Sequence, residues 1–447
     1  MEQRLFGTAG IRGDVMTKVT PSFCLEFGKV LARHFGSKGY ARIVIGTDAR
    51  RSGPALSHAL MTGVLSCGMD VVRIGQVPTP ALAYATHSFG LPGVMVTASH
   101  NPPTDNGLKC FECGYEIGRE DEIRLEELFF CNAHSSSFAP HGAVIQRDVM
   151  PAYAHALRTY VCGLFPDISL HGMTVLLDGG NGVGVRVLQN VLFECGATVI
   201  SCNSHTSGDF PGRASEPSPD NLSELLHFAR HIGPDLIIAQ DGDADRIAAY
   251  AHNGTPFPED SIIALFADFY SSPGDTVVLS IDTSLRTDIV VRRKDVSVFR
   301  VPLGYLHDGM KMHNPAFAAE PWKHIHVPFG PWIDGIVSAL LLSFLLATDP
   351  YESLFSSIPS YSFEKRNVNM TSPGQVNELI ERLRRELGTR DDVKTIDETS
   401  GIRVNFLDDS WILVRPSGTE PKVRCIVEGT TDARFNELSE IIARLVD

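Results

Sequence analysis

An apolar run that ends in a small turn decides the expected fold, and its clearest example is Val175-Leu176-Leu177-Asp178-Gly179-Gly180. Similar runs, each ending in a turn that carries Asp or Gly, occupy residues 43–48, 236–241 and 277–282. These runs are short and do not alternate with polar residues, which is typical of strands buried on both faces of a sheet. Helical patterns separate them, so the sequence predicts an α/β protein with mainly parallel sheets.

The length and the loop-like segments indicate several domains. A chain of 447 residues is too long for one ordinary core, so three or four domains are expected. Stretches rich in Ser, Pro, Gly or His at 132–142, 203–221 and 349–362 are expected to be boundaries or long loops. In open parallel sheets, ligands bind beyond the carboxyl ends of the strands. The Asp-Gly turns are therefore the first places to look for a site.

The pattern changes after residue 362. Ser372 followed by Pro373 resembles a helix start, and Gly388 a helix end. Between them, and again near the C-terminus, apolar residues recur at helical spacing. The two faces consist of Val376, Leu379, Ile380, Leu383 and Leu387, and of Phe435, Leu438, Ile441, Ile442 and Leu445. Two helices flanking short strands predict a small α+β domain at the C-terminus.

Composition and charge exclude several classes of protein. Hydrophobic residues make up 43% and charged residues 21% of the chain, as in soluble globular proteins. The net charge of −14 argues against a protein that coats nucleic acid. Residues 1–7 form no apolar signal region, and the apolar run 336–347 is too short to span a membrane. Nine scattered cysteines suit a reducing compartment, so we expect a cytoplasmic protein that binds neither nucleic acid nor membrane.

One segment offers a hydroxyl nucleophile. The run Thr97-Ala98-Ser99-His100-Asn101-Pro102 follows the apolar residues 93–96. A serine hydroxyl is a weak nucleophile that needs a base, a metal or a prior modification, and His100 adjoins Ser99. No G-x-S-x-G pattern surrounds Ser99, which disfavours a serine hydrolase. Alone, the segment fits either a nucleophile loop or an ordinary polar turn.

A second segment offers a cation site. Asp241, Asp243 and Asp245 alternate along the chain, and Arg246 follows them. Three carboxylates so close together repel one another unless a cation lies among them. Oxygen ligands favour Mg²⁺ or Ca²⁺ over zinc. The pattern predicts a hard-cation site, with a solvated acidic turn as the alternative.

Two further segments suit an anion. The first combines cations, hydroxyls and a glycine, which suit a dianionic phosphate. It contains Arg415, Ser417, Gly418, Thr419, Lys422 and Arg424. The second, at 7–13, has glycines and Arg12. It lacks the G-x-x-x-x-G-K-[ST] pattern, so no Walker nucleotide site is indicated. Alone, the first segment also fits a basic surface turn.

Taken in order, these segments resemble those of the α-D-phosphohexomutase family. Residues 6–13 resemble its opening motif, 97–102 its phosphoserine loop, 241–246 its magnesium loop and 415–421 its phosphate-binding loop. The resemblance implies three similar mixed, mainly parallel α/β domains and a C-terminal α+β domain around a central cleft. We place the four domains at 1–147, 148–250, 251–350 and 360–447.

The resemblance also implies roles for individual residues. Ser99 would carry a phosphoryl group, and Mg²⁺ would bind it together with Asp241, Asp243 and Asp245. Arg12 and Lys109 match positions near the transferring group, with Lys109 a candidate for acid–base work. His100 is a further catalytic candidate. The implied substrate-binding residues are Arg246, Glu320, His324, Arg415, Ser417, Gly418, Thr419 and Arg424. A sugar 1,6-bisphosphate would be the intermediate and activator.

The expected sugar-reading loop departs from the family pattern of Gly-Glu-x-Ser-Gly-His. Its best match is the segment 318–324, in which Glu320 and His324 agree while Trp322 and Lys323 replace Ser and Gly. Tyr305 also stands where the family often has Asp. The sequence therefore supports the chemistry better than the identity of the sugar.

The sequence as a whole predicts a Mg²⁺-dependent phosphosugar mutase that interconverts sugar 1- and 6-phosphates. Phosphoglucosamine or phosphomannose and phosphoglucose are the expected substrates, with phosphopentose as the alternative. A non-catalytic sugar-phosphate binder and a phosphatase on the same scaffold are competing functions. The oligomeric state, monomer or homodimer, is left open.

Overall fold

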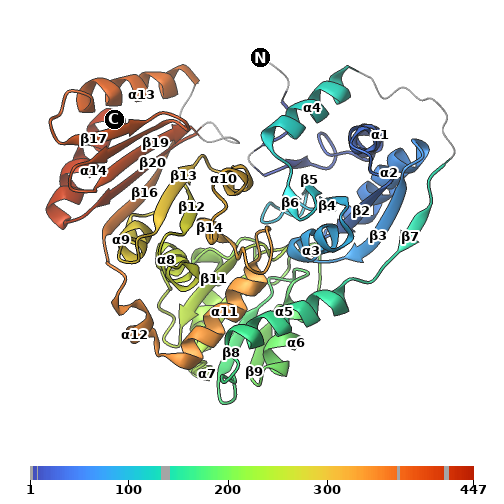
Figure 1. Cartoon of the computed structure of the whole chain (residues 1–447), viewed down its shortest axis with the longest axis horizontal. Coiled ribbons are helices and arrows are strands. Elements are labelled where there is room, and N and C mark those ends of the chain that lie inside the picture. The colour runs from blue at the N-terminus through green and yellow to red at the C-terminus, as the bar shows by residue number, and fades with distance from the viewer. Residues whose placement is uncertain (1–3, 8, 132–140, 370–372, 417–421, 447) are drawn as a thin grey trace. The chain divides into compact units, whose positions relative to one another are not determined.

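The computed structural model describes residues 4–7, 9–131, 141–369, 373–416 and 422–446, and Figure 1 labels its elements. The chain divides into two compact units. The first unit comprises Met1–Glu259 and Trp322–Leu354, and the second comprises Asp260–Pro321 and Phe355–Asp447.

The first sheet of the first unit has the strand order β1-β5-β4-β2-β3-β7, with β6 paired to β5. Its strands are β1 (Ile11–Asp14), β2 (Arg42–Thr47), β3 (Asp70–Gln76), β4 (Pro92–Val96), β5 (Asp105–Glu112), β6 (Tyr115–Glu116) and β7 (Val144–Gln146). Strands β2, β3, β4 and β7 run parallel, whereas β5 is antiparallel to both of its neighbours β1 and β4. The sheet is therefore mixed but mainly parallel.

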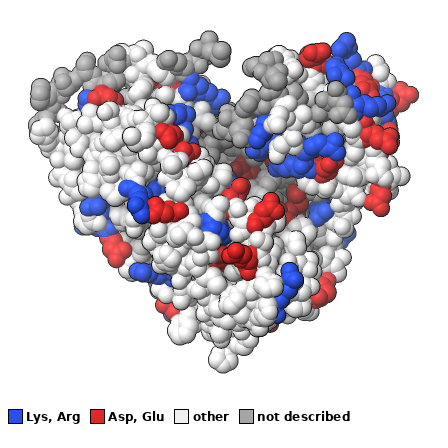
Figure 2. Space-filling model, turned by 180° about the vertical axis from the view of Figure 1, so that it is seen from behind, with Lys and Arg blue, Asp and Glu red and all other residues white. Residues whose placement is uncertain are grey.

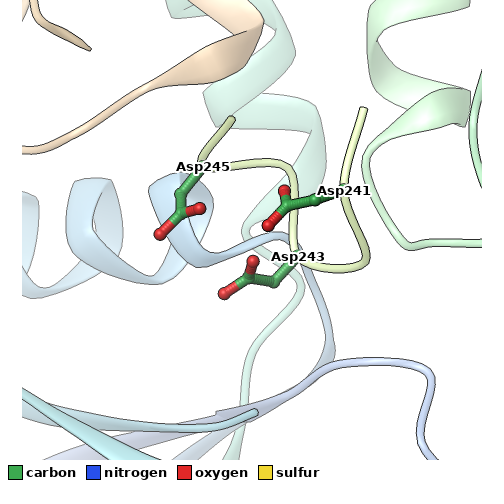
Figure 3. Close-up of side chains that lie close together, drawn as sticks. All are labelled: Asp241, Asp243 and Asp245. Carbon is green, nitrogen blue, oxygen red and sulfur yellow. The ribbon is translucent and has the colours of Figure 1, made fainter. Parts of the chain in front are cut away.

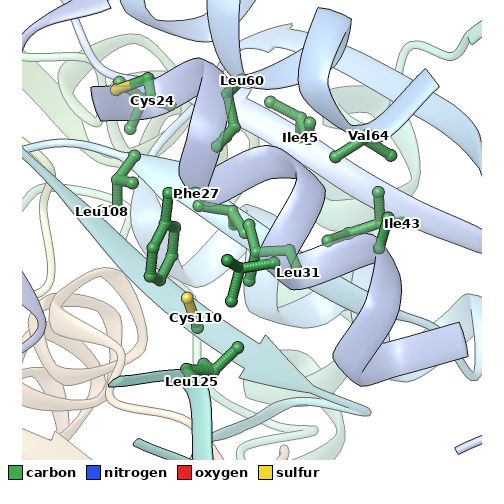
Figure 4. Close-up of a cluster of buried hydrophobic side chains, with 14 of the residues drawn as sticks. Cys24, Phe27, Leu31, Ile43, Ile45, Leu60, Val64, Leu108, Cys110 and Leu125 are labelled. Atoms are coloured by element: carbon green, nitrogen blue, oxygen red, sulfur yellow. The ribbon is translucent and has the colours of Figure 1, made fainter. Parts of the chain in front are cut away.

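Apolar side chains from several elements form the core beside this sheet, as Figure 4 shows. The helices of this region are α1 (Pro21–Ser37), α2 (Gly53–Ser66), α3 (Thr79–Phe89) and α4 (Arg119–Phe130). Helix α1 begins at Pro21 because the Thr20 hydroxyl accepts the backbone N–H of Phe23, which caps the helix. Phe27 and Leu31 of α1 pack with Leu60 of α2 in this core. The core fixes β4 and β5, which flank the candidate site.

The second sheet of the first unit has the order β11-β10-β8-β9. Its strands are β8 (Thr174–Asp178), β9 (Thr198–Cys202), β10 (Leu236–Gln240) and β11 (Ile247–Ala251). The surrounding helices are α5 (Met150–Leu164), α6 (Val185–Glu194), the 3₁₀-helix η1 (Asp220–Leu222) and α7 (Ser223–Ile232). The unit also contains β15 (Lys323–Ile325) and the buried helix α11 (Gly335–Thr348), which packs against β10 and β11. The apolar run 336–347 lies within α11, most of whose residues are buried.

The second unit contains a parallel group of strands in the order β13-β12-β14. Their bounds are β12 (Thr276–Ser280), β13 (Ser297–Val301) and β14 (Phe317–Glu320). The accompanying helices are α8 (Glu259–Tyr270), α9 (Arg286–Arg292) and α10 (Leu306–His313). Together with the first two sheets, these strands confirm the predicted mixed α/β class.

The fourth sheet is antiparallel, with the order β16-β20-β19-β18-β17. Its strands are β16 (Ser362–Asn369), β17 (Val393–Asp397), β18 (Ile402–Phe406), β19 (Trp411–Pro416) and β20 (Lys422–Gly429). Helices α13 (Pro373–Leu387) and α14 (Asp432–Val446) pack their apolar residues onto it, which confirms the predicted C-terminal α+β domain. The predicted start of α13 at Ser372 lies outside the described residues.

One observation qualifies a sequence expectation. The stretch 349–362, expected as a boundary or long loop, contains the short helix α12 (Tyr351–Ser356), and the first unit ends within it at Leu354. Among the described helices, none is long and apolar enough to cross a membrane. On the face shown in Figure 2, basic side chains are interspersed with acidic ones. The charged groups that concern the candidate site are buried ones.

Candidate active site

Ser99 lies in the loop after β4 and is fully buried. Its backbone is left-handed, with φ of 51°, a conformation that is uncommon for residues other than glycine. The Ser99 N–H donates to the Thr97 hydroxyl at 2.9 Å, which ties the loop to the end of the strand. Such strain is characteristic of functional turns that the surrounding structure holds in place.

Arg50, a buried residue that the sequence analysis did not identify, holds this loop. Its guanidinium donates to backbone carbonyl oxygens of four loop residues, Ser99, Asn101, Pro102 and Asp105. It also pairs with Asp48, whose Oδ2 lies 3.1 Å from Arg50 Nε. Burial raises the pKa of Asp48 to about 6. No local sequence pattern could have identified Arg50, because the carbonyl groups that it binds lie some fifty residues further along the chain.

The acidic triplet lies in the turn between β10 and β11, and Figure 3 shows its carboxylates grouped around a common point. One carboxylate oxygen from each of Asp241, Asp243 and Asp245 lies within 4.8 Å of the others, and all three residues are fully buried. Ala244, between the second and third aspartates, has a left-handed φ of 59°. This tight turn brings the alternating aspartates together, as their spacing predicted.

The Ser99 loop and the acidic triplet meet directly. The Ser99 hydroxyl donates to Asp241 Oδ2 at 2.7 Å. Ser215 joins the same two loops, because its hydroxyl donates to the Ser99 carbonyl at 3.1 Å and accepts the Gly242 N–H at 3.0 Å. The Thr79 hydroxyl donates to Asp243 Oδ2 at 2.6 Å. Thr79 and Ser215 are further residues that the sequence analysis missed.

The donor set of the triplet fits a hard divalent cation such as Mg²⁺. The Oδ1 atoms of Asp243 and Asp245 are buried and have no hydrogen-bond partner within the described part of the chain. Burial, followed by the charges of Asp243 and Asp245, raises the pKa of Asp241 well above its usual value. Buried carboxylate oxygens without donors are costly unless a cation compensates them.

Cations surround the triplet. Lys109 Nζ lies 2.5 Å from Asp245 Oδ2 and 3.6 Å from Glu116 Oε1. Burial opposes the charged form of Lys109, but these carboxylates outweigh it and raise its pKa. The amide nitrogen of Arg246 donates to Asp241 Oδ1 at 3.3 Å. Lys109 is therefore held as an ammonium ion.

Arg12 and His100 share this environment. Burial and the nearby charge of Arg246 lower the pKa of Arg12, whose Nε and Nη2 have no hydrogen-bond partner among the residues described. Burial, and then the charges of Arg246, Arg12 and Lys323, lower the pKa of His100 to about 2. His100 Nδ1 lies 3.3 Å from the Ser99 hydroxyl. His100 is accordingly a neutral neighbour of Ser99.

In the predicted sugar-reading loop, protein groups already engage several side chains. His324 Nδ1 lies 3.0 Å from the Ser338 hydroxyl, and its Nε2 lies 3.0 Å from Glu259 Oε1. Trp322 packs against the apolar cluster around Leu225 and Tyr250. In the second unit, Glu320 Oε2 accepts the Gly304 N–H at 3.1 Å. The Trp322 ring is thus half-buried against the edge of this cluster.

The second unit holds a separate group of cations. Arg415 Nη2 donates to the buried Asp282 Oδ2 at 3.1 Å, and Lys365 Nζ lies 3.9 Å from the same atom. Arg424 of β20 is the strand partner of Arg415. Burial, with the charges of Arg424 and Arg415, lowers the pKa of Lys365 despite Asp282. Two cations at one carboxylate, with the charge of Arg424 acting on Lys365, suit an anion. No local pattern in the sequence had pointed to Lys365.

The structure thus brings many of the predicted site residues together, whereas others lie outside the residues it describes. Within the first unit, the residues at one place are Ser99, His100, Arg12, Lys109, Asp241, Asp243, Asp245 and Arg246. Ser417, Gly418 and Thr419 lie outside the described residues. The roles of all these residues toward a substrate stay predictions.

Comparisons with known proteins cover the whole length of the chain. Models of the phosphoglucomutase/phosphomannomutase family match as α/β/α domain I at 3–135, domain II at 151–254 and domain III at 258–361. The model of the family's C-terminal domain matches residues 367–445.

Curated relatives and solved structures agree with these matches. A phosphopentomutase of Thermococcus kodakarensis is 43% identical over 446 residues, covering 98% of this chain and 96% of the relative. A probable phosphoglucosamine mutase of Methanothermobacter thermautotrophicus is 36% identical over 454 residues, covering 98% and 96%. A solved phosphoglucomutase/phosphomannomutase family protein from Burkholderia thailandensis has a TM-score of 0.86 at 24% identity, covering 99% and 96%. That structure supports the fold alone.

Proposed function

Because this chain belongs to the phosphoglucomutase/phosphomannomutase family and is a phosphosugar mutase, we propose that it transfers phosphoryl groups through Ser99. The observation that carries the proposal is the distance of 2.7 Å between the Ser99 hydroxyl and Asp241 Oδ2. This contact, at the edge of the three carboxylates, supports a role for the Ser99 hydroxyl as the nucleophile.

Asp241, Asp243 and Asp245 would hold Mg²⁺, and Ser99 would complete the set once it is phosphorylated. A bound Mg²⁺ supplies neutralisation of the negative charge that develops on a transferring phosphoryl group. Asp243 Oδ1 and Asp245 Oδ1, which have no hydrogen-bond donor among the described residues, support this assignment.

The cations of this chain do the remaining electrostatic work. Lys109 is held as an ammonium by Asp245 and Glu116, so its role is to stabilise charge rather than to accept a proton. Arg12 Nε and Nη2, which have no partner among the described residues, can donate hydrogen bonds to phosphate oxygens. His100, as a neutral imidazole, positions the Ser99 hydroxyl.

The phosphate that is not reacting would bind the cations of the second unit. Lys365 and Arg415 supply positive charge at Asp282, and Arg424 is the strand partner of Arg415. Ser417, Gly418 and Thr419 stay candidates for its hydroxyl and amide contacts. The proposed reaction passes through a sugar bisphosphate. Return of one of its two phosphates to Ser99 gives back the substrate, and return of the other gives the product.

We assign a phosphopentose, interconverted between its 1- and 5-phosphates, as the preferred substrate. The similarity to a phosphopentomutase supports this choice. So does the altered sugar loop, because the half-buried Trp322 packs against an apolar cluster and both ring nitrogens of His324 have protein neighbours. Such a loop offers few groups for reading extra hydroxyls. Phosphoglucosamine, phosphomannose and phosphoglucose are the second candidates, supported by the phosphoglucosamine mutase relative.

The Ser99 assignment is tested by intact-mass measurement of the protein after incubation with Mg²⁺ and a sugar bisphosphate. We expect one added phosphoryl group on the wild type and none on Ser99→Ala. Ser169→Ala, which alters a hydroxyl in a loop elsewhere in the first unit, is the matched control and is expected to take up phosphate normally. A phosphorylated Ser99→Ala protein would refute the assignment.

The substrate is tested by a panel of pentose, glucosamine, mannose and glucose 1-phosphates. We expect the highest kcat/KM for the pentose. A higher value for any hexose contradicts the pentose assignment but leaves Ser99 in place. Binding of sugar phosphate without turnover would identify a non-catalytic binder, and net release of phosphate would identify a phosphatase.

A further inference from the structure

The second unit contains a cavity of about 400 Å³ that shares no lining residue with the Arg415 group. Its walls come from α9, from β13 and from the strands β17 and β18 of the fourth sheet. The volume falls within the range of small-molecule sites. All lining residues belong to the second unit, so this cavity is separate from the Ser99 loop and the acidic triplet.

Most charged groups on the cavity wall are already paired. Arg300 makes a two-pronged pair with Asp288, at 2.8 and 2.6 Å. Lys394 and Arg292 both approach Asp409, at 3.1 and 3.5 Å. These pairs leave Arg403 as the cation of this wall that has no carboxylate within 4 Å among the residues described.

Arg403 is 1% exposed, and two of its three guanidinium nitrogens have partners. Nε donates to Asn405 Oδ1 at 2.9 Å, and Nη1 donates to the Ile281 carbonyl. The guanidinium also stacks on Trp411, at 3.8 Å from the ring centroid, which fixes its plane. Nη2 has no hydrogen-bond partner within the described chain.

An unpaired guanidinium nitrogen at a buried position is unfavourable unless an acceptor reaches it. Burial, and then the charge of Arg300, lowers the pKa of Arg403 well below its usual value. Cationic side chains outnumber carboxylates by one on the cavity wall. An oxyanion beside Nη2 would supply the missing acceptor and add to the negative charge of Asp288, Glu428 and Asp282, which acts on Arg403 from beyond 4 Å.

We propose that this cavity binds a small phosphate monoester, whose phosphate accepts hydrogen bonds from Arg403 Nη2. Thr395 and Asn405, which are hydrogen-bonded to each other at 3.0 Å on the cavity wall, provide polar contacts for the rest of the ligand. The site does not depend on the chemistry proposed at Ser99.

The test is Asn405→Asp, a nearly isosteric change that places a carboxylate 2.9 Å from Arg403 Nε. The new carboxylate pairs with the guanidinium and repels an incoming phosphate. Asn436→Asp, on the exposed side of α14, makes the same change of charge in the same domain and is the matched control. Melting temperatures of the full chain are measured with increasing inorganic phosphate and, separately, glycerol 2-phosphate.

Each ligand should raise the melting temperature of the wild type and that of Asn436→Asp by the same amount. The rise should be at most half as large in Asn405→Asp, because this variant loses binding at Arg403. Some rise remains, because phosphate binding near Arg415 is common to all three proteins. In phosphate-free buffer, Asn405→Asp should melt at or above the wild-type temperature. Equal phosphate responses in all three proteins would overturn the proposal.

A structural experiment keeps the proposal testable should Asn405→Asp fold poorly. Wild-type crystals soaked in selenate are expected to show an anomalous selenium peak within hydrogen-bond distance of Arg403 Nη2. Selenate near Arg415 but not at Arg403 would refute the site.

Discussion

At the scale of single residues, the Ser99 loop depends on a side chain far from it in the sequence. A left-handed backbone at a serine costs about 1 kcal/mol or more, so other contacts must hold it. Arg50 supplies them through its hydrogen bonds to four carbonyl groups and its pair with Asp48. Arg50 thus positions Ser99, and under the proposed function it would act on the reaction in this way.

The Arg50→Lys variant tests this role. A lysine keeps the charge but cannot reach several carbonyls in one plane. We expect kcat to fall by about 100-fold, with a much smaller change in KM, because the nucleophile is misplaced. Arg51→Lys, at a neighbouring exposed position, is the control and should behave as wild type. Wild-type kcat in Arg50→Lys would show that the loop holds its own shape.

The Asp243→Asn variant tests the cation site. It removes one carboxylate of the triplet while keeping its size and its contact with Thr79. We expect turnover to fall at least about 100-fold, comparable to the loss of one electrostatic stabiliser. Asp220→Asn, at the exposed start of the 3₁₀-helix η1 in the same unit, should leave turnover unchanged. Near-normal steady-state rates for Asp243→Asn would count against the metal assignment.

At the scale of elements, glycines set how closely α1 and α2 approach. A Cβ added at Gly63 would lie 2.1 Å from the Leu25 carbonyl oxygen, and one at Gly28 would lie 2.3 Å from the Leu60 carbonyl oxygen. The two helices therefore meet backbone to backbone above the sheet that carries the Ser99 loop.

Gly63→Ala should force these helices apart. Overpacking of this kind typically costs about 1–3 kcal/mol, so we expect a lower melting temperature for the variant. Gly36→Ala is the control, because its Cβ would meet no atom closer than 3.9 Å and alanine favours a helix. It should leave stability unchanged or raise it slightly. Equal effects of the two substitutions would show that the close approach is not the cause.

At the scale of the whole molecule, the acidic triplet links loops from two sheets of the first unit. Ser99 lies in the loop after β4 and Thr79 is the first residue of α3, beside the first sheet, whereas the aspartates and Ser215 follow strands of the second sheet. A cation at the triplet would therefore stabilise several segments at once, all within the first unit.

Hydrogen exchange measured by mass spectrometry, with Mg²⁺ or with chelator, tests this link. We expect Mg²⁺ to slow amide exchange in peptides covering 76–101 and 239–247. Peptides from α13 and α14 serve as internal controls and should exchange at the same rate in both conditions. Asp243→Asn should lose the protection. Uniform protection, or none, would argue against a cation bound by the triplet.

Much of the fold and part of the site followed from local patterns. The apolar runs at 43–48, 175–180, 236–241 and 277–282 are strands β2, β8, β10 and β12, because an uninterrupted apolar run needs burial on both faces. The resemblance to the phosphohexomutases is confirmed by family models along the whole chain. The triplet was visible because its ligands alternate within five residues of one turn.

The sequence by itself determined which segments form strands and helices, which motifs the chain carries, and that its three aspartates suit a cation. Only the tertiary structure decided that Arg50 holds the Ser99 loop and that the Ser99 hydroxyl reaches Asp241 across 142 residues of chain. It also decided that Arg403 Nη2 has no hydrogen-bond partner among the described residues. The reason is physical. Periodicity and turn chemistry act over a few neighbouring residues, whereas a buried charge finds its partners only when distant elements have packed.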